Sequence, residues 1–452
     1  MKFPMKLART LLPVATLAAF LLTAGAAGAA PAPQPPPPKL ETIDLQTAIG
    51  YALENNFDIR QARERIRQQE GVVIEVTARA IPNVGLGGGF QYNEKEISSS
   101  SPPSNRAWTL GLTATQTLYA GGGVRSAIRS SELAREAALL ELKAVINAAL
   151  LQVRTSFYSV LLARERIKVQ EDNLALLEQQ LKTTTDRFEA GTVSGFERLR
   201  ADVAVANARS PLISARNDYR LAIEALRQAL GLTNPHPEAL AKEPVVVGTL
   251  EFTPTTFDLA SAFSTARANR PDLQRLAKLT QAREQSVRTA RSGRLPSIDL
   301  VGGWDLRKGP TNSFGDSREG LYLGLQSNWA IFDGRATAGR VAQARSIVEQ
   351  TRLTLVEQEL AVEVEVRRAY SSWQEATELV EASGRVVEQA EEAVRLANAR
   401  YSAGTGTQLD VLQAQVELTT ARSNQVQAFY NYNVAVASLR QAMGMTDALI
   451  GE

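Results

Sequence analysis

Few residues in this 452-residue chain could carry chemistry. His236 is the single histidine and lies in an Asn-Pro-His-Pro stretch, and cysteine is absent. Ser-His-Asp catalysis would have to use that one loop imidazole, and the metal-ligand clusters of deaminases or proteases are absent. The glycines at 85–89 and 121–123 lack the Gly-x-Gly-x-x-Gly frame, and no Gly-Lys-Ser/Thr follows them. We therefore predict no catalytic residue, no metal site and no cofactor.

Charged residues are numerous but balanced. The chain has 50 Lys and Arg against 48 Asp and Glu, a formal net charge of +2. Acidic pairs such as Glu391-Glu392 fit the solvated face of a coiled coil. A chain without a basic field is a poor ligand for phosphate backbones, so nucleic acid is not a predicted partner.

Residues 1–30 have the layout of a secretory signal peptide. A basic start precedes an apolar run from Leu11 to Leu22, and Ala27-Gly28-Ala29 offers a small-residue cleavage site. A membrane anchor is the alternative, but a spanning helix needs about 20 apolar residues. A proline-rich leader follows at 31–40.

The chain contains an internal duplication with an offset of 213 or 214 residues. Ile81-Pro82 recurs as Leu295-Pro296, and Leu230-Gly231 recurs as Met443-Gly444. An offset that stays constant from the first of these motifs to the last indicates two copies of one structural unit. We predict a first repeat at 41–231, a connector at 232–256, a second repeat at 257–444 and a tail at 445–452.

Each copy has two segments in which apolar and polar residues alternate, which predicts β-strands. Their polar positions are mostly Gly, Thr and amide residues, and aromatic residues lie near the predicted strand ends, as at a membrane interface. A soluble sheet with one wet face fits each strand equally well. Four strands cannot close a transmembrane barrel, so several chains would have to combine. The predicted strands are about 83–97, 107–120, 296–306 and 320–332, and the interface aromatics are Tyr92, Trp108, Trp304 and Trp329.

Long helices with heptad spacing make up the rest of each copy and predict left-handed coiled coils. The longest would measure about 100 Å, nearly the summed length of the two shorter helices of its copy. We expect each copy to be one long helix beside two stacked short ones, with strands at one end. The predicted helices are about 57–80, 123–190, 195–231, 271–294, 334–403 and 407–443.

With these features the chain resembles the TolC family of outer-membrane channel-tunnels over nearly its whole mature length. The most specific match is the run Tyr401-Ser-Ala-Gly-Thr-Gly-Thr-Gln-Leu-Asp-Val-Leu412. The resemblance implies a mainly α fold with a small β part. A homotrimer would form a 12-stranded transmembrane β-barrel in outer-membrane lipid, joined to a 12-helix coiled-coil tunnel in the periplasm of a Gram-negative bacterium.

The resemblance also implies a function and partners. The protein would be the passive exit duct of a tripartite multidrug efflux or type I secretion system. A periplasmic adaptor (membrane fusion protein) and an inner-membrane pump of RND, ABC or MFS type would deliver small molecules or proteins to it. A secreted periplasmic coiled-coil scaffold without a membrane barrel is the alternative that the residues leave open.

Site residues carry over from the family by position. Helix-tip residues that would dock the adaptor are Gly191, Thr192, Gly404 and Thr405, and periplasmic gate positions are Asp410, Glu197 and Gln413. The family's gate arginine is replaced here by Gly406, and Gln413 replaces a second acidic residue. We expect the two remaining carboxylates to give a modest cation preference; otherwise they are ordinary solvated helix residues.

Overall fold

The computed structural model describes residues 42–92, 94, 106–233, 245–309 and 315–445. The predicted signal peptide and proline-rich leader, His236, residues 95–97 of the first predicted strand and nearly all of the C-terminal tail lie outside these ranges.

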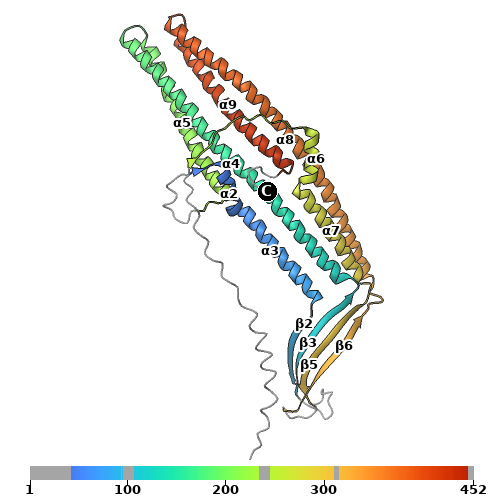
Figure 1. The fold of residues 1–452 in the computed structure, drawn as a ribbon. Coiled ribbons are helices and arrows are strands. Elements are labelled where there is room, and N and C mark those ends of the chain that lie inside the picture. The colour runs from blue at the N-terminus through green and yellow to red at the C-terminus, as the bar shows by residue number, and fades with distance from the viewer. Residues whose placement is uncertain (1–41, 93, 95–105, 234–244, 310–314, 446–452) are drawn as a thin grey trace, which may run out of the picture. The chain divides into compact units, whose positions relative to one another are not determined.

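The described chain repeats one order of elements twice (Figure 1). The first copy contains α2 (Leu45–Asn55), α3 (Phe57–Thr77), the 3-10 turn η1 (Ala78–Ala80), β2 (Asn83–Tyr92), β3 (Arg106–Ala120), α4 (Gly123–Glu189) and α5 (Gly195–Leu230). The second contains α6 (Leu259–Asn269), α7 (Pro271–Ser292), β5 (Ser297–Lys308), β6 (Ser317–Asn328), α8 (Ala336–Ser402) and α9 (Gln408–Ala442). The two-residue strands β1 (Thr42–Ile43) and β4 (Val245–Val246) pair in parallel.

The short helices α2 and α6 were not predicted from the sequence. Each has 11 residues and begins at an equivalent aspartate: Asp44 accepts a hydrogen bond from the Thr47 N–H, and Asp258 accepts one from the Ser261 N–H, both at 2.8 Å. These are ordinary N-caps. Elements of three turns carry too few apolar repeats to stand out by periodicity, and the cap was the signal that could have located them.

The four longer strands form one antiparallel sheet in the order β2-β3-β5-β6, so the central pair joins the two copies. Pairing places Leu86, Leu112, Trp304 and Leu321 in one row across the sheet. A neighbouring row on the other face consists of Gly87, Gly111, Asp305 and Gly320. The sheet therefore has an apolar face and a polar face, as the alternation predicted. β6 ends at Asn328, four residues before the predicted end.

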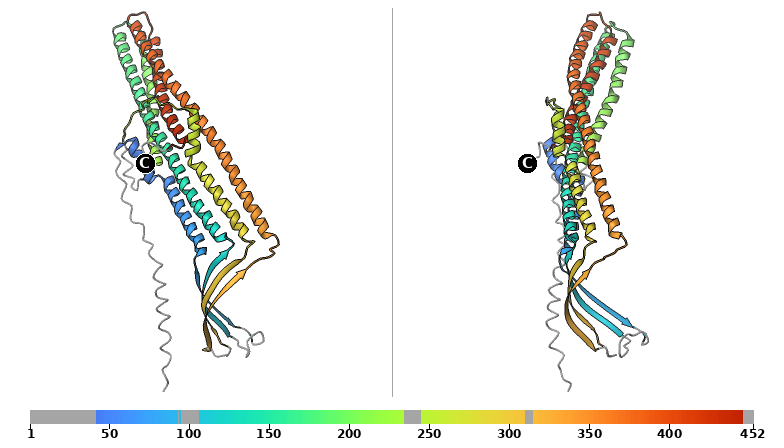
Figure 2. Two further views of the ribbon diagram at one scale, coloured as in Figure 1. Left: turned by 45° about the vertical axis from the view of Figure 1, so that its right-hand side comes forward. Right: turned by 90° about the vertical axis from the view of Figure 1, so that its right-hand side faces the viewer.

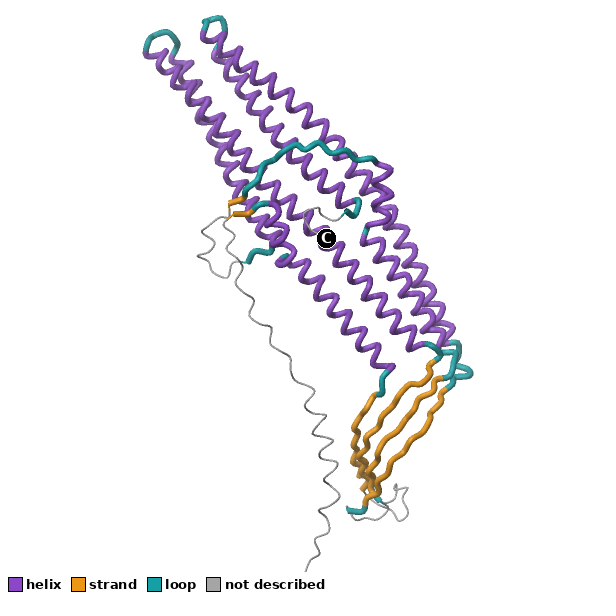
Figure 3. Tube along the Cα trace, in the orientation of Figure 1, coloured by secondary structure: helices purple, strands orange, loops and turns teal. Residues whose placement is uncertain are grey.

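The helices lie side by side along their lengths (Figures 2 and 3). α4 packs against α3 and α5 of its own copy and against α7 and α9 of the other, while α8 packs against α7 and α9. Each long helix thus runs beside two short ones, as the helix lengths predicted. The helical turns α4–α5 and α8–α9 lie at the end away from the sheet (Figure 1).

Glycine makes the stacking of the short helices possible. Gly231, which follows α5, has a φ of +72°, and a Cβ there would lie 2.5 Å from the Asn55 carbonyl oxygen. The Asn56 side chain, at the start of α3, donates a 2.8 Å hydrogen bond to the Ala229 carbonyl. This close end-to-end contact is the physical reason for the Leu230-Gly231 motif, and Gly444 approaches Arg270 in the same way in the second copy.

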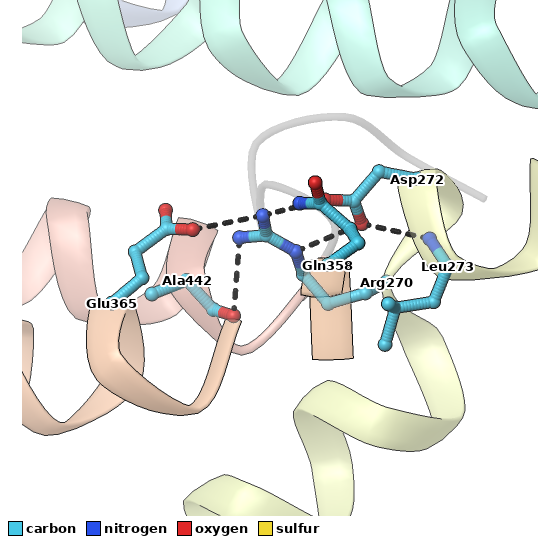
Figure 4. A network of polar contacts seen from close by, with 6 residues as sticks. All are labelled: Arg270, Asp272, Leu273, Gln358, Glu365 and Ala442. Atoms are coloured by element: carbon cyan, nitrogen blue, oxygen red, sulfur yellow. Dashed lines mark hydrogen bonds and ion pairs between the residues drawn. The ribbon is translucent and has the colours of Figure 1, made fainter. Parts of the chain in front are cut away.

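At the equivalent junction of the second copy, Arg270 occupies the position that Asn56 has in the first, and its guanidinium adds a positive charge there (Figure 4). Its guanidinium donates to Asp272 (2.8 Å), to Glu365 (2.9 Å) and to the Ala442 carbonyl (3.4 Å). Burial alone would raise the pKa of Asp272, but the hydrogen bond and charge of Arg270 outweigh it, so that pKa lies below its ordinary value. The network joins α7, α8 and α9 at one point.

Among the described helices, α4 is the one with a stretch long and apolar enough to cross a membrane, by length and composition alone. Less than half of that stretch, 44%, is buried within the chain. Residues 144–163 of α4 contain one charged side chain, Arg154, and Val153, Phe157 and Val160 among them are fully or almost fully buried. Packing between neighbouring helices accounts for much of this apolar character.

Candidate functional site

The two helix tips are built alike. At the first, Gly191 has a φ of +74° and the Thr192 N–H donates to the Arg187 carbonyl at 2.9 Å. At the second, Gly404 has a φ of +75° and the Thr405 N–H donates to the Arg400 carbonyl at 2.9 Å. This is the Schellman ending of a helix, which requires a left-handed residue and thus favours glycine. All four predicted docking residues are exposed at these turns.

Asp410 and Glu197 occupy the same position in the two copies, the third residue of the returning helix. Asp410 closes a capping box: its carboxylate accepts from the Thr407 N–H (2.9 Å), and the Thr407 hydroxyl accepts from the Asp410 N–H (3.2 Å). Hydrogen bonds from the Thr407 backbone and side chain lower the pKa of Asp410. The carboxylate therefore stays ionised at neutral pH and stabilises the start of α9.

Glu197 has a different partner, which connects the two tips. The Tyr401 hydroxyl donates to its Oε2 at 3.3 Å, and the Arg187 guanidinium lies 4.8 Å from the centre of the Tyr401 ring. Tyr401 belongs to α8, whereas the other two residues belong to the first hairpin. The sequence analysis missed this contact. The sequence offered one signal for this contact: Tyr401 carries a hydroxyl, whereas Phe188, the equivalent residue of the first copy, has none.

Gln413, the third predicted gate position, is exposed on α9 and donates to Glu417 at 3.2 Å, one turn further along the helix. The structure thus brings Glu197 into contact with the opposite tip, and it gives Asp410 and Gln413 partners within their own helix.

The four predicted interface aromatics lie at three levels of the sheet. Tyr92 and Trp108 lie at the loop end of the sheet, where Trp108 pairs with Phe90. Trp329 follows β6 at the helix end, and its Nε1 donates to the Arg294 carbonyl at 3.2 Å. Trp304 does not lie near a strand end, contrary to the prediction. Its pairing with Leu112 and Leu321 places it inside the sheet, because β5 extends to Lys308.

The polar face of the sheet is held by side-chain hydrogen bonds between strands. Thr113 and Tyr322 approach to 3.1 Å, and Thr117 donates to Asp299 at 2.7 Å. Such a face presents hydroxyl and carboxylate groups, which suit contact with water. Among the described residues, no group of three or more His, Cys, Asp or Glu side chains is placed to hold a metal ion.

A duplicated sheet and hairpin, with an apolar sheet face and capped helix tips, defines a channel-forming protein of the bacterial outer membrane. Residues 48–232 and 262–445 match the family model described as outer membrane efflux protein, and the chain belongs to that family. The resemblance to the TolC family, the mainly α fold class and the outer-membrane location are thereby confirmed.

Two relatives are similar in sequence along most of their length. Protein CyaE of Bordetella pertussis is 26% identical over 389 residues, covering 86% of this chain and 81% of CyaE. The outer membrane protein TolC of Escherichia coli K12 is 27% identical over 387 residues, covering 82% of this chain and 76% of TolC. The crystal structure of the Campylobacter jejuni CmeC outer membrane channel has the same fold, with a TM-score of 0.76, 16% identity and coverage of 88% and 85%.

Proposed function

We propose that this protein is the outer-membrane exit duct of a tripartite efflux or type I secretion system, through which small molecules or proteins pass without chemical change. The observation that carries the proposal is the four-stranded sheet. It has one apolar face and two unpaired edges, β2 and β6, among the described strands. In lipid each unpaired backbone group costs several kcal/mol, so such a sheet requires strands from other copies.

Strand direction supports closure by further copies of the same chain. Because neighbouring strands are antiparallel, β2 and β6 run in opposite directions. Pairing β6 of one copy with β2 of the next therefore continues the antiparallel pattern without interruption. Three copies supply 12 strands, an even number within the range of transmembrane barrels.

The helices support the same assembly. In the half nearest the tips the described packing order is α5-α4-α9-α8, which leaves α5 and α8 at the two flanks. Both flanking helices carry exposed apolar side chains in this half, which is typical of an unfilled helix–helix seam. On α5 they are spaced by three or four residues (Phe196, Leu199 and Val203), and on α8 they are Leu379, Val386 and Leu396. Four helices per copy would give a tunnel of 12.

The tips would meet the partners. Gly191-Thr192 and Gly404-Thr405 are the exposed turns furthest from the sheet, which suits end-to-end docking to a periplasmic adaptor. The adaptor would in turn connect to an inner-membrane pump of RND, ABC or MFS type. Near the same end, Asp410, Glu197 and Gln413 would line the periplasmic constriction, and Tyr92, Trp108 and Trp329 would lie at the membrane interfaces.

Fractionation and oligomer analysis test the proposal. In fractionated cells the full chain should sediment with the outer membrane, and after purification it should migrate in mild detergent as a trimer that heating dissociates. Reconstituted in a planar bilayer, it should conduct ions. A monomer released by osmotic shock and soluble without detergent would contradict the duct and support the periplasmic scaffold.

A further inference from the structure

Five arginines, the junction arginines, lie where the strands of the sheet join the helices. Each of the four strand–helix junctions carries at least one of them. They are Arg79 before β2, Arg125 after β3, Arg291 and Arg294 before β5, and Arg335 after β6. All five side chains are exposed, and none has a hydrogen-bond or ion-pair partner within the part of the chain that the structure describes.

The excess of positive charge is found at this end of the sheet and not at the other. The four junctions contain the five arginines and one acidic residue, Asp333, which gives a net charge of +4 per chain. Asp333 is already engaged, because its Oδ2 accepts from the Thr337 N–H at 2.7 Å. At the loop end of the sheet, the described residues carry four basic and four acidic side chains, so the net charge is zero. The junctions are residues 78–82, 121–125, 291–296 and 329–335, and the loop end comprises the described residues 94, 106, 305–309 and 315–319.

Arg335 has a backbone conformation that arginine does not favour. Its φ is +71°, and it is the one residue other than glycine with a left-handed φ in the described chain. The first copy has Gly122 at the equivalent position before its long helix, with a φ of +77°. Glycine adopts this conformation without the strain that a Cβ causes. An arginine retained at a strained position indicates that its side chain has a function there.

Exposed apolar side chains accompany the arginines. Ile331 and Phe332 precede Arg335 in the chain and are 85% and 84% exposed. Trp329 is 57% exposed, and its contact with the Arg294 carbonyl joins the junction after β6 to the junction before β5. Aromatic, aliphatic and basic side chains at one level are typical of the boundary between the hydrocarbon core and the lipid headgroups.

We propose that the junction arginines bind the headgroup phosphates of anionic phospholipids in the leaflet that faces the periplasm. This inference rests on the proposed function, which places the helix end of the sheet at that leaflet. A guanidinium donates two parallel hydrogen bonds to one phosphate, whereas a lysine ammonium acts as a point charge, and lysine is absent from the four junctions. Phosphate binding by Arg335 offsets the backbone strain at that residue. The bound lipids fix the height at which the sheet sits in the membrane.

Two substitutions separate lipid binding from a structural role. Arg335→Gly relieves the strain, so in uncharged detergent without lipid it should raise the unfolding temperature by about 1–4 °C. Arg294→Gln should leave that temperature unchanged, because the backbone at Arg294 is not left-handed and the carbonyl that Trp329 contacts is retained. Phosphatidylglycerol is then titrated in, and the rise in unfolding temperature is followed. Each variant should need about fivefold more lipid for half of the full rise, the factor that corresponds to about 1 kcal/mol per arginine near an anionic surface.

The matched control is Arg385→Gln, which removes the same charge from an exposed position of α8, 50 residues further from the sheet than Arg335. It should need the same lipid concentration as the unaltered chain. Phosphatidylcholine, which has no net charge, and inorganic phosphate should give much smaller rises.

Four results would overturn the inference. A lower unfolding temperature for Arg335→Gly in detergent alone would make Arg335 a structural residue. Equal effects of Arg385→Gln and Arg294→Gln would show a response to net charge only. A rise with phosphatidylcholine as large as with phosphatidylglycerol would remove the preference for anionic lipid, and an equal rise with inorganic phosphate would make the ligand a free anion. Failure of the unaltered chain to form a trimer or conduct ions would instead contradict the proposed function.

Discussion

The end-to-end junction of the short helices offers a sharp test of the fold. In Gly231→Ala, the new Cβ would lie 2.5 Å from the Asn55 carbonyl oxygen and 2.9 Å from the Asn55 carbonyl carbon. Both are backbone atoms and cannot rotate away. The φ of +72° adds a second penalty, because a residue with a Cβ is disfavoured in the left-handed region.

The two penalties differ in size and can be separated. Left-handed backbone costs a residue other than glycine about 1–2 kcal/mol. The overlap between the new Cβ and Asn55 must push α5 away from α3, which endangers the buried hydrogen bond from Asn56 to Ala229. Loss of that hydrogen bond costs about 1–3 kcal/mol more. We therefore expect Gly231→Ala to lower the free energy of unfolding by roughly 2–5 kcal/mol.

The matched control is Gly122→Ala. Gly122 has a φ of +77°, but a Cβ there would meet no atom within 4 Å, so only the conformational penalty of about 1–2 kcal/mol applies. Thermal unfolding of the full chain in detergent, followed by far-UV circular dichroism, compares the variants. Gly231→Ala should unfold at a clearly lower temperature than Gly122→Ala. Equal unfolding temperatures would refute the close-contact argument.

Three further predictions concern the tips. Tyr401→Phe removes the hydroxyl that donates to Glu197 at 3.3 Å. The lost hydrogen bond is worth about 0.5–1.5 kcal/mol, so the open-channel fraction in single-channel recordings should rise several-fold. An unchanged fraction would exclude this bond from the gate. Gly404→Arg should abolish export while trimer yield stays normal, because a bulky charge blocks an exposed turn; normal export would contradict docking there. Asp410→Ala should reduce cation preference in reversal-potential measurements. Because the pKa of Asp410 lies below its ordinary 3.8, the capping box contributes fully above that pH and should be lost only as the pH falls through the lower value.

Much of the architecture could be predicted from the sequence. The constant offset between repeated motifs such as Leu230-Gly231 and Met443-Gly444 established the duplication. The alternation of apolar and polar residues in 83–92 identified a strand with one apolar face. Heptad spacing gave the long helices and their lengths. These features are repeated many times along one element, so the linear order of residues is enough to reveal them.

The residues at the junctions and tips could be found but not explained. Gly231 and Gly444 stood out because they recur, yet only the structure shows that Asn55 and Arg270 leave no room for a Cβ. Asp410 stood out through its family position, and the structure adds that it caps its own helix. A contact made once, between residues far apart in the chain, leaves no periodic pattern.

The sequence alone therefore determined the duplication, the amphipathic faces and the need for further strands, because each depends on neighbours within one element. The tertiary structure decided which elements meet: β3 beside β5 across the two copies, Tyr401 beside Glu197, and Gln408 beside Thr184 across the two hairpins. Pairing and register depend on packing between distant segments, and only the folded chain brings those segments together.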